Sequence, residues 1–117
     1  MKSLNEKLSA VRDTLLTVID GEGNGVPVYH YFRPTNITKG YIVWMEDGED
    51  VSFAAENRKA EQQIHGTIDY YTQTEFDPVT DSVQNALDGA QIGFRLNSVQ
   101  YEDSTKLIHY EWEFWTV

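Results

Sequence analysis

Alternation between apolar and other residues is the feature that most constrains what this chain can fold into. It runs from about Gln62 to Thr72 and again from Leu107 to Val117, and a period of two residues is typical of strands with one buried face. Two long, half-buried strands are therefore predicted. The side chains expected to face inward are Ile64, Gly66, Ile68 and Tyr70 in the first strand and Ile108, Tyr110, Trp112 and Phe114 in the second, with Glu111 and Glu113 facing the other way.

Helical spacing marks the start of the chain instead. From Leu4 to Ile19 apolar residues recur every three or four positions and so share one face of a helix. Ser3 and Glu6 form the S-x-x-E pattern of a capping box, and Gly21 is expected to end the helix. The sequence thus predicts an amphipathic first helix with a well-defined beginning.

A second, shorter helix is expected after Asp77, because this N-cap residue is followed by Pro78 at the first helical position. An apolar stripe continues from there to Gly89. Further strands are predicted at Val28–Arg33, at Tyr41–Glu46 and from Ile92 onward, the last forming a hairpin with the strand from Leu107 through a polar turn at 102–105.

The element order predicts an α+β fold with a mainly antiparallel sheet of about five strands and both helices packed on one face. Val28–Arg33 and Tyr41–Glu46 are expected to form an aromatic first hairpin. The stretch Glu46–Lys59 has little apolar pattern and is expected to be a long loop or a flexible hairpin. A length of 117 residues is consistent with a single domain spanning 1–117.

Charge and cysteine content exclude several classes of function. Nine basic and nineteen acidic residues give a net charge of -10, so a generic nucleic-acid-binding surface is disfavoured because phosphate would be repelled. The chain has no cysteine, which removes disulfides and thiolate chemistry and favours an intracellular protein. No stretch approaches the roughly 20 apolar residues of a membrane span.

Three groups of residues are candidate metal sites, and for each of them an interpretation without a metal is preferred. Asp20–Gly25 resembles the start of a calcium loop, but Tyr31 stands where the bidentate carboxylate belongs. The carboxylates between Glu46 and Asp50 are expected to form a solvated turn. His65 and His109 would hold zinc only if they paired across strands, and no spacing motif supports that. No metal or other cofactor is therefore expected.

Catalytic motifs are also missing from the sequence. There is no nucleophile elbow, no phosphate-binding glycine loop and no cysteine nucleophile. Glu111 and Glu113 share a strand face, which is expected to be solvated in preference to forming a hydrolase dyad. An enzyme is not expected.

Three segments together resemble the tail-terminator or tail-completion (head-tail joining) family of long-tailed bacteriophages and prophages. The first is Tyr70–Pro78, a strand that ends in a tyrosine-rich polar run and passes directly into a short helix. The second is the aromatic pair Val28–Tyr31 and Gly40–Trp44 followed by acidic residues. The third is the aromatic and acidic strand after Tyr101-Glu102 that closes the chain.

The resemblance implies a structural virion protein that caps the tail tube as a ring, usually of six subunits, and joins it to the head connector. Its partners would be other copies of itself, the major tail tube protein and the head-connector protein, at the head-proximal end of the tail after assembly in the bacterial cytoplasm. The genome would pass through without specific binding, since an acidic lumen repels DNA. Glu111 and Glu113, or alternatively the acidic residues from Glu46 to Asp50, are candidates for that lumen.

The long loop expected at Glu46–Lys59 is the segment expected to contact partners. Its candidate residues are Asp47, Glu49, Asp50, Phe53, Arg58 and Lys59. Two alternatives stay open: a neighbouring head-tail adaptor or stopper protein, and a small host ligand-binding domain. The second would use an aromatic pocket drawn from Tyr29, Tyr31, Tyr41, Trp44 and Trp112.

Overall fold

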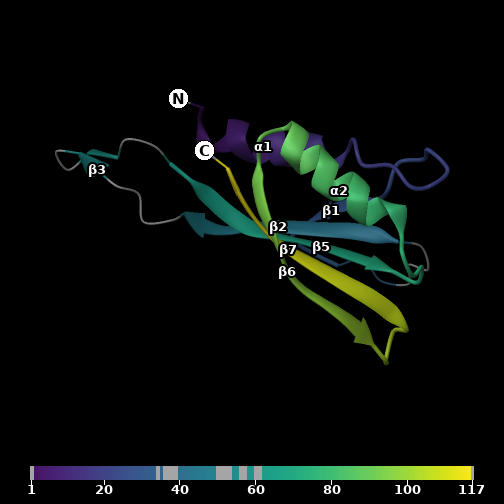
Figure 1. Ribbon diagram of the computed structural model, residues 1–117. Coiled ribbons are helices and arrows are strands. Elements are labelled where there is room, and N and C mark those ends of the chain that lie inside the picture. Colours follow the sequence, from purple (N-terminus) through teal and green to yellow (C-terminus); the bar gives the residue numbers. More distant parts are fainter. Residues whose placement is uncertain are drawn as a thin grey trace.

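A computed structural model describes residues 2–33, 35, 40–49, 54–55, 58–59 and 62–116, with only the backbone at 54–55 and 58–59. The described elements are two helices and seven strands, which Figure 1 labels along the chain. In order they are α1 (Leu4–Leu15), β1 (Val28–His30), β2 (Tyr41–Glu49), β3 (Ala54–Ala55), β4 (Arg58–Lys59), β5 (Ile64–Thr72), α2 (Pro78–Gly89), β6 (Gly93–Glu102) and β7 (Leu107–Thr116).

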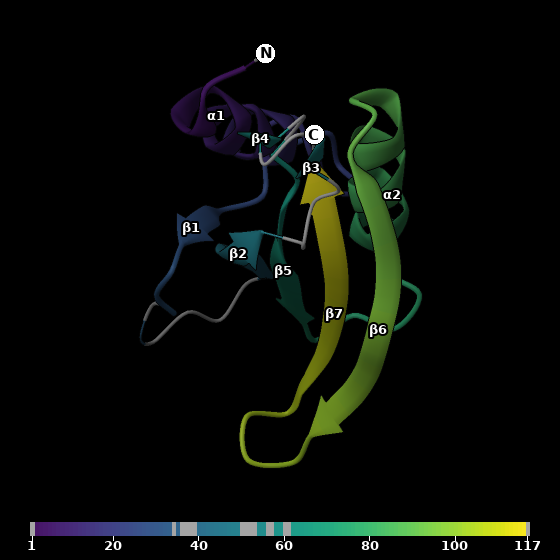
Figure 2. The same ribbon diagram turned by 90° about the vertical axis from the view of Figure 1, so that its left-hand side faces the viewer.

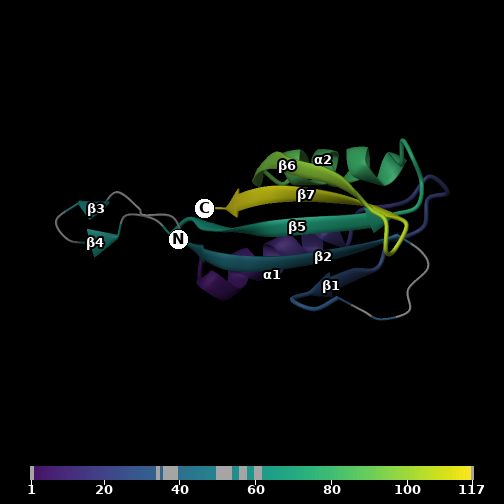
Figure 3. The same cartoon turned by 90° about the horizontal axis from the view of Figure 1, so that it is seen from below.

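Five of the strands form one sheet in the order β1-β2-β5-β7-β6, and β3 and β4 form a separate antiparallel pair. Every pairing in the large sheet is antiparallel except that of β1 with β2. Both helices cover the same face of this sheet (Figure 1). The predicted α+β fold is therefore confirmed. Figure 3 shows the sheet from the face that carries no helix.

The expected first hairpin is wrong, because β1 runs parallel to β2. β1 is also shorter than the predicted Val28–Arg33. It ends at His30, and Tyr31 follows with a φ of 76°, a left-handed conformation that breaks an extended strand. The Tyr31 amide still donates to the carbonyl of Trp44, at 2.9 Å, which anchors this turn to β2. Alternating side chains predict a strand but say nothing of its direction.

The core lies between the helices and the sheet. Val11 and Leu15 from α1 and Val83 and Leu87 from α2 are completely buried there. The sheet contributes the alternating positions that the sequence predicts, among them Ile42, Trp44, Ile68, Trp112 and Phe114. β5 alternates between buried and half-buried side chains along its whole length. The predicted inward face is thus confirmed for β5 and for Tyr110, Trp112 and Phe114 of β7, whereas Ile108 lies outside the core.

The first helix begins as predicted and ends earlier. Ser3 and Glu6 form the reciprocal capping box. The helix stops at Leu15. The amides of Thr17 and Val18 bond three residues back, and Val18 turns into the core instead of continuing the helix towards Gly21.

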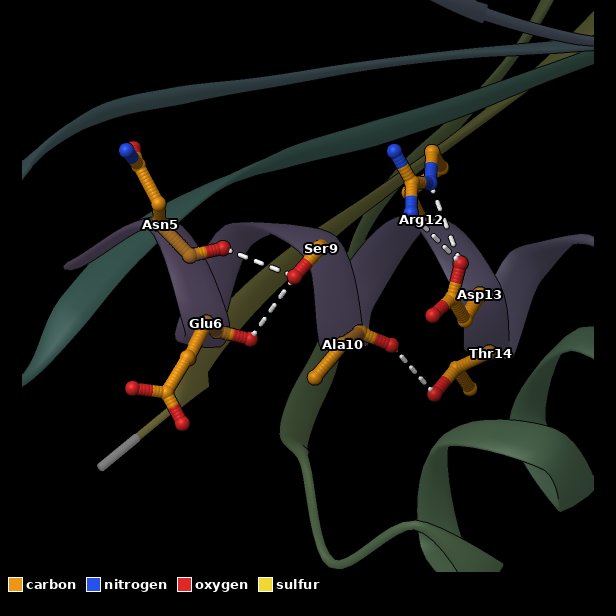
Figure 4. Close-up of polar contacts among 7 residues, drawn as sticks. All are labelled: Asn5, Glu6, Ser9, Ala10, Arg12, Asp13 and Thr14. Carbon is orange, nitrogen blue, oxygen red and sulfur yellow. Dashed lines mark hydrogen bonds and ion pairs between the residues drawn. The ribbon is translucent and has the colours of Figure 1, made fainter. Parts of the chain in front are cut away.

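On the outer side of α1 the polar side chains bond within the helix (Figure 4). The Ser9 hydroxyl donates to the carbonyls of Asn5 and Glu6, and the Thr14 hydroxyl donates to Ala10, at 2.7 Å. This side of α1 is satisfied locally.

The second helix is anchored to the end of β5 by Asp77. One carboxylate oxygen accepts from the hydroxyls of Tyr70 and Thr72, each at 2.7 Å, and the other accepts from the amide of Val79, at 2.9 Å. Asp77 is buried, and α2 runs to Gly89 as predicted. The Tyr70–Pro78 segment is therefore a strand-to-helix junction held by one buried N-cap residue.

The hairpin of β6 and β7 extends past the helices, as Figures 1 and 2 show. Its turn lies at residues 103–106, close to the predicted position. A bulge between Leu96 and Ser98 shifts the register, so that Leu96, Val99 and Tyr101 all lie opposite the inward residues of β7. These three side chains are on the helix side of the hairpin but exposed.

Candidate functional site

The helix-free face of the sheet gathers a group of titratable side chains on its central strands. Asp69 on β5 lies directly opposite Glu111 on β7, and His109 is two residues before Glu111 on the same face. One possible ligand atom from each of these three residues lies within 4.8 Å of the others. We call Asp69, His109 and Glu111 the carboxylate–histidine cluster.

Hydrogen bonds hold the cluster in place. His109 Nε2 lies 2.7 Å from Asp69 Oδ1, and His109 Nδ1 lies 3.7 Å from Glu102 Oε2. The Asn97 side-chain amide donates to Glu111 Oε2 at 2.6 Å. The hydrogen bond to Asp69 raises the pKa of His109 above its ordinary value, although burial acts in the opposite direction. The side chains of His109 and Asp69 are only 17% and 18% exposed.

Aromatic rings cover one side of the cluster. The ring of Tyr71 stacks on His109 with centroids 4.3 Å apart and on Tyr41 at 4.9 Å. The Arg33 guanidinium lies over the Tyr71 ring, 5.1 Å from its centroid. Burial raises the pKa of Tyr71 to about 12, so this phenol stays neutral near pH 7. These rings limit the access of water to His109.

Glu111 and Glu113, two of the lumen candidates, share the helix-free face as the alternation predicts, but they have different neighbours. Glu113 forms an ion pair with Arg95 of β6, its Cα partner across the hairpin. Glu111 instead belongs to the cluster. The face is therefore acidic around His109 and closer to neutral at Glu113.

The predicted partner-contact loop is a strand over part of its length. β2 continues through a bulge between Glu46 and Gly48 to Glu49, because β5 lies beside it and supplies pairing partners. Asp47 reaches His65, with 2.5 Å between carboxylate oxygen and ring nitrogen. A hairpin, the other expected form, is present where Arg58 and Lys59 pair with Ala55 and Ala54. The candidates Asp50 and Phe53 lie outside the described residues.

A zinc pair of His65 and His109 is not formed. His65 lies opposite Trp115 and His109 opposite Tyr71, near opposite ends of the β5–β7 ladder. Both histidines contact a carboxylate instead, as does His30, whose Nε2 lies 2.7 Å from Glu46. Their partners depend on strand register, which the sequence pattern leaves undetermined.

None of the aromatic residues proposed for a ligand pocket lines the cleft that the described residues form. Trp44 and Trp112 are buried in the core between the sheet and the helices. Tyr41 is buried on the opposite, helix-free face of the sheet. The cleft, of about 740 Å³, lies elsewhere, between the glycine-rich turn after α1 and the β5–α2 junction. Its lining includes Asp20, Asn24, Gly40, Tyr70 and Asp77.

The outer edge of β6 is a feature that the sequence reasoning missed. β6 ends the strand order, so among the described strands only β7 pairs with it. Its exposed apolar residues Leu96, Val99 and Tyr101 form what we call the hairpin stripe. The apolar side chains themselves were visible in the sequence, but the bulge that puts all three on one face was not.

Phe76, in the turn between β5 and α2, is the most exposed large hydrophobic residue among those described, with 89% of its surface accessible. Its φ of 55° is a left-handed conformation that is rare for a bulky side chain. Exposure and strain at one aromatic residue are unfavourable in an isolated chain.

Comparison with known proteins adds no family to this description. No protein-family model matches the chain, and a search of curated proteins finds no match. Neither described helix is long and apolar enough to cross a membrane.

Proposed function

We propose that this protein is a structural subunit of a phage or prophage virion, a tail terminator that assembles into a ring at the head-proximal end of the tail tube. In that position it would contact the tube protein on one side and the head connector on the other. The family resemblance gives the place in the virion. The open edge of β6 with its hairpin stripe is the observation that supports self-assembly.

A strand edge of this kind favours association. β6 spans Gly93–Glu102, and its outer edge has backbone groups free to pair with another chain. Edges of this kind are usually protected by charged side chains, above all lysine, by proline, by a bulge or by a covering element. β6 has the bulge between Leu96 and Ser98 and the charged Arg95, but neither lysine nor proline. Val99 and Tyr101 add apolar surface that a neighbouring subunit would cover.

Ring closure requires two different surfaces on each subunit, because a head-to-tail interface joins unlike patches. The β6 edge lies at one side of the sheet and β1 at the other. Phe76 supplies a further exposed anchor away from both edges. The subunit thus has several separate surfaces on which a ring and its two axial partners could form.

The acidic charge is consistent with a channel for DNA. A ring multiplies the subunit charge of -10, and acidic walls prevent the genome from adhering. Glu111 and Asp69 concentrate negative charge on the helix-free face, whereas the nearby Glu113 is paired with Arg95. In the proposed ring, the helix-free face is the one that would suit a lumen.

Inactivation of the gene in the phage or prophage that encodes it tests this function. The proposal predicts tail tubes of irregular length that do not join to filled heads, seen by negative-stain electron microscopy. A plasmid copy of the wild-type gene should restore normal virions. Normal, infectious virions from the inactivated genome would contradict the proposal.

A further inference from the structure

We infer that the carboxylate–histidine cluster on the helix-free face binds a divalent transition-metal ion such as Zn²⁺. The site consists of Asp69, His109 and Glu111, with Glu102 at its edge. This inference does not depend on the proposed function, since a single chain supplies all of these residues. A bound cation would reduce the negative charge that Asp69 and Glu111 lend to the proposed lumen, which would then rely on the other acidic residues of the chain.

The donor set determines the class of metal. One imidazole nitrogen and two carboxylate oxygens suit Zn²⁺, Co²⁺ or Mn²⁺, whereas Mg²⁺ and Ca²⁺ prefer oxygen ligands alone. Without cysteine the chain has no thiolate to favour a softer ion. Three protein ligands leave room for water in the remaining coordination positions.

The backbone holds the three ligands on a rigid support. They come from β5 and β7, adjacent central strands that pair without interruption from Ile64 to Thr72. The side chains of Asp69 and His109 are less than one-fifth exposed. Asn97 orients the Glu111 carboxylate through its hydrogen bond. Less conformational entropy is lost on binding than at a site built on a loop.

Charge supplies an independent argument. Asp69, Glu102 and Glu111 place three carboxylates beside the single imidazole of His109. Two described arginines on this face are engaged with other groups: Arg95 pairs with Glu113, and Arg33 lies over Tyr71. A divalent cation would neutralise the remaining negative charge at a partly buried site, where repulsion is weakly screened.

Binding requires the three ligand atoms, which lie within 4.8 Å of one another, to adopt the spacing that the metal sets. His109 Nε2 and Asp69 Oδ1 are now 2.7 Å apart, and a metal between them would replace the proton of their hydrogen bond. Tetrahedral zinc with bonds near 2.0–2.1 Å sets its ligand atoms about 3.3 Å apart. An opening of roughly 0.6 Å is within reach of a side-chain adjustment at Asp69.

Titration of the full chain with Zn²⁺ alone, by calorimetry, and with Co²⁺, by visible absorption, tests the inference. We expect one ion to bind per chain. Bound Co²⁺ should show the visible absorption bands that are typical of a low coordination number. His109→Gln and Glu111→Gln should each weaken Zn²⁺ binding by at least about tenfold, since loss even of an outer-sphere partner typically costs 10–100-fold. Glu113→Gln, which removes a carboxylate from the same face but not from the cluster, is the matched control and should bind Zn²⁺ like the wild type.

A measurement on the wild-type chain keeps the test valid if a variant does not fold. In ¹⁵N spectra of the histidine rings, Zn²⁺ should shift the signals of His109 and leave those of His30 and His65 unchanged. Binding that is equally strong for Mg²⁺, or that survives in a folded His109→Gln variant, would overturn the inference and indicate a non-specific acidic surface.

Discussion

Gly66 is the position where a single methyl group should do the most damage. It lies on β5 between Glu46 of β2 and Phe114 of β7, beside the bulge in β2. A Cβ added there would come within 2.1 Å of the Met45 carbonyl oxygen, 2.7 Å of the Glu46 Cα and 2.8 Å of the Phe114 ring. Two of these neighbours are backbone atoms, so no side-chain rotation relieves the clash.

The size of the effect follows from that geometry. Overpacking a core costs about 1–3 kcal/mol when side chains can adjust, and more when the backbone must move. Separating β2 from β5 by over 1 Å would break ladder hydrogen bonds at the centre of the sheet. We therefore expect Gly66→Ala to lower the free energy of unfolding by at least about 3 kcal/mol, a large share of the roughly 5–15 kcal/mol typical of a domain.

Urea denaturation followed by tryptophan fluorescence measures this loss. With a typical slope of about 1–3 kcal/mol/M, the midpoint should fall by roughly 1–3 M. Gly89→Ala is the matched control, because a Cβ there meets nothing within 4 Å and the residue ends a helix. That change should stabilise the protein by about 0.5–1 kcal/mol. A Gly66→Ala midpoint within error of the wild type would refute the reasoning.

Three further substitutions test other parts of the structure. Asp77→Ala should cost about 2 kcal/mol in urea denaturation, since it removes a helix cap and leaves the hydroxyls of Tyr70 and Thr72 without their acceptor, whereas an effect below about 0.5 kcal/mol would contradict the junction described above. At Glu46 burial acts to raise the pKa, but hydrogen bonds from the neighbouring tyrosine and histidine outweigh it and lower the pKa. The carboxylate therefore stabilises the fold above its unfolded pKa near 4.3, and this contribution disappears as pH falls through the lower folded pKa, so the stability deficit of Glu46→Gln should be larger at pH 7 than at pH 3. If Glu46→Gln lowered the stability equally at both pH values, the lowered pKa assigned to Glu46 would be contradicted. Phe76→Asn should stabilise the isolated chain by about 0.5–1 kcal/mol, because asparagine tolerates the left-handed conformation better, and thermal unfolding would show a raised midpoint, while a lowered one would show that the phenylalanine packs against the fold.

Local patterns predicted the elements that depend on local chemistry. The capping box at Ser3 and Glu6, the start of α2 at Asp77 and the buried face of β5 all follow from residues close in sequence. The same patterns failed where pairing with a neighbouring strand determines the local structure. β2 continues through the acidic residues to Glu49 because β5 is beside it, although their polarity favours a loop.

The candidate site was less predictable than the fold, because it depends on register between distant strands. Glu111 and His109 were each singled out from the sequence, but not as neighbours, and Asp69 was not singled out. Asp69 and His109 meet Glu111 only because residue 69 pairs with residue 111 across β5 and β7. A shift of one residue would send the same side chains to the helix side. The hairpin stripe likewise depends on the bulge at Leu96/Ser98.

The central claim is that copies of this chain associate through the edge of β6, and sedimentation velocity over a range of concentrations tests it most directly. Val99 on the hairpin stripe and Ile19 after α1 are β-branched and equally exposed, at 49% and 48%, so Val99→Lys and Ile19→Lys make a matched pair. The account predicts that the wild type and Ile19→Lys form a discrete ring of about six 13.5 kDa subunits at high concentration, while Val99→Lys stays monomeric and folded. A wild-type chain that remains monomeric at every concentration, or a Val99→Lys variant that assembles like the wild type, would contradict it.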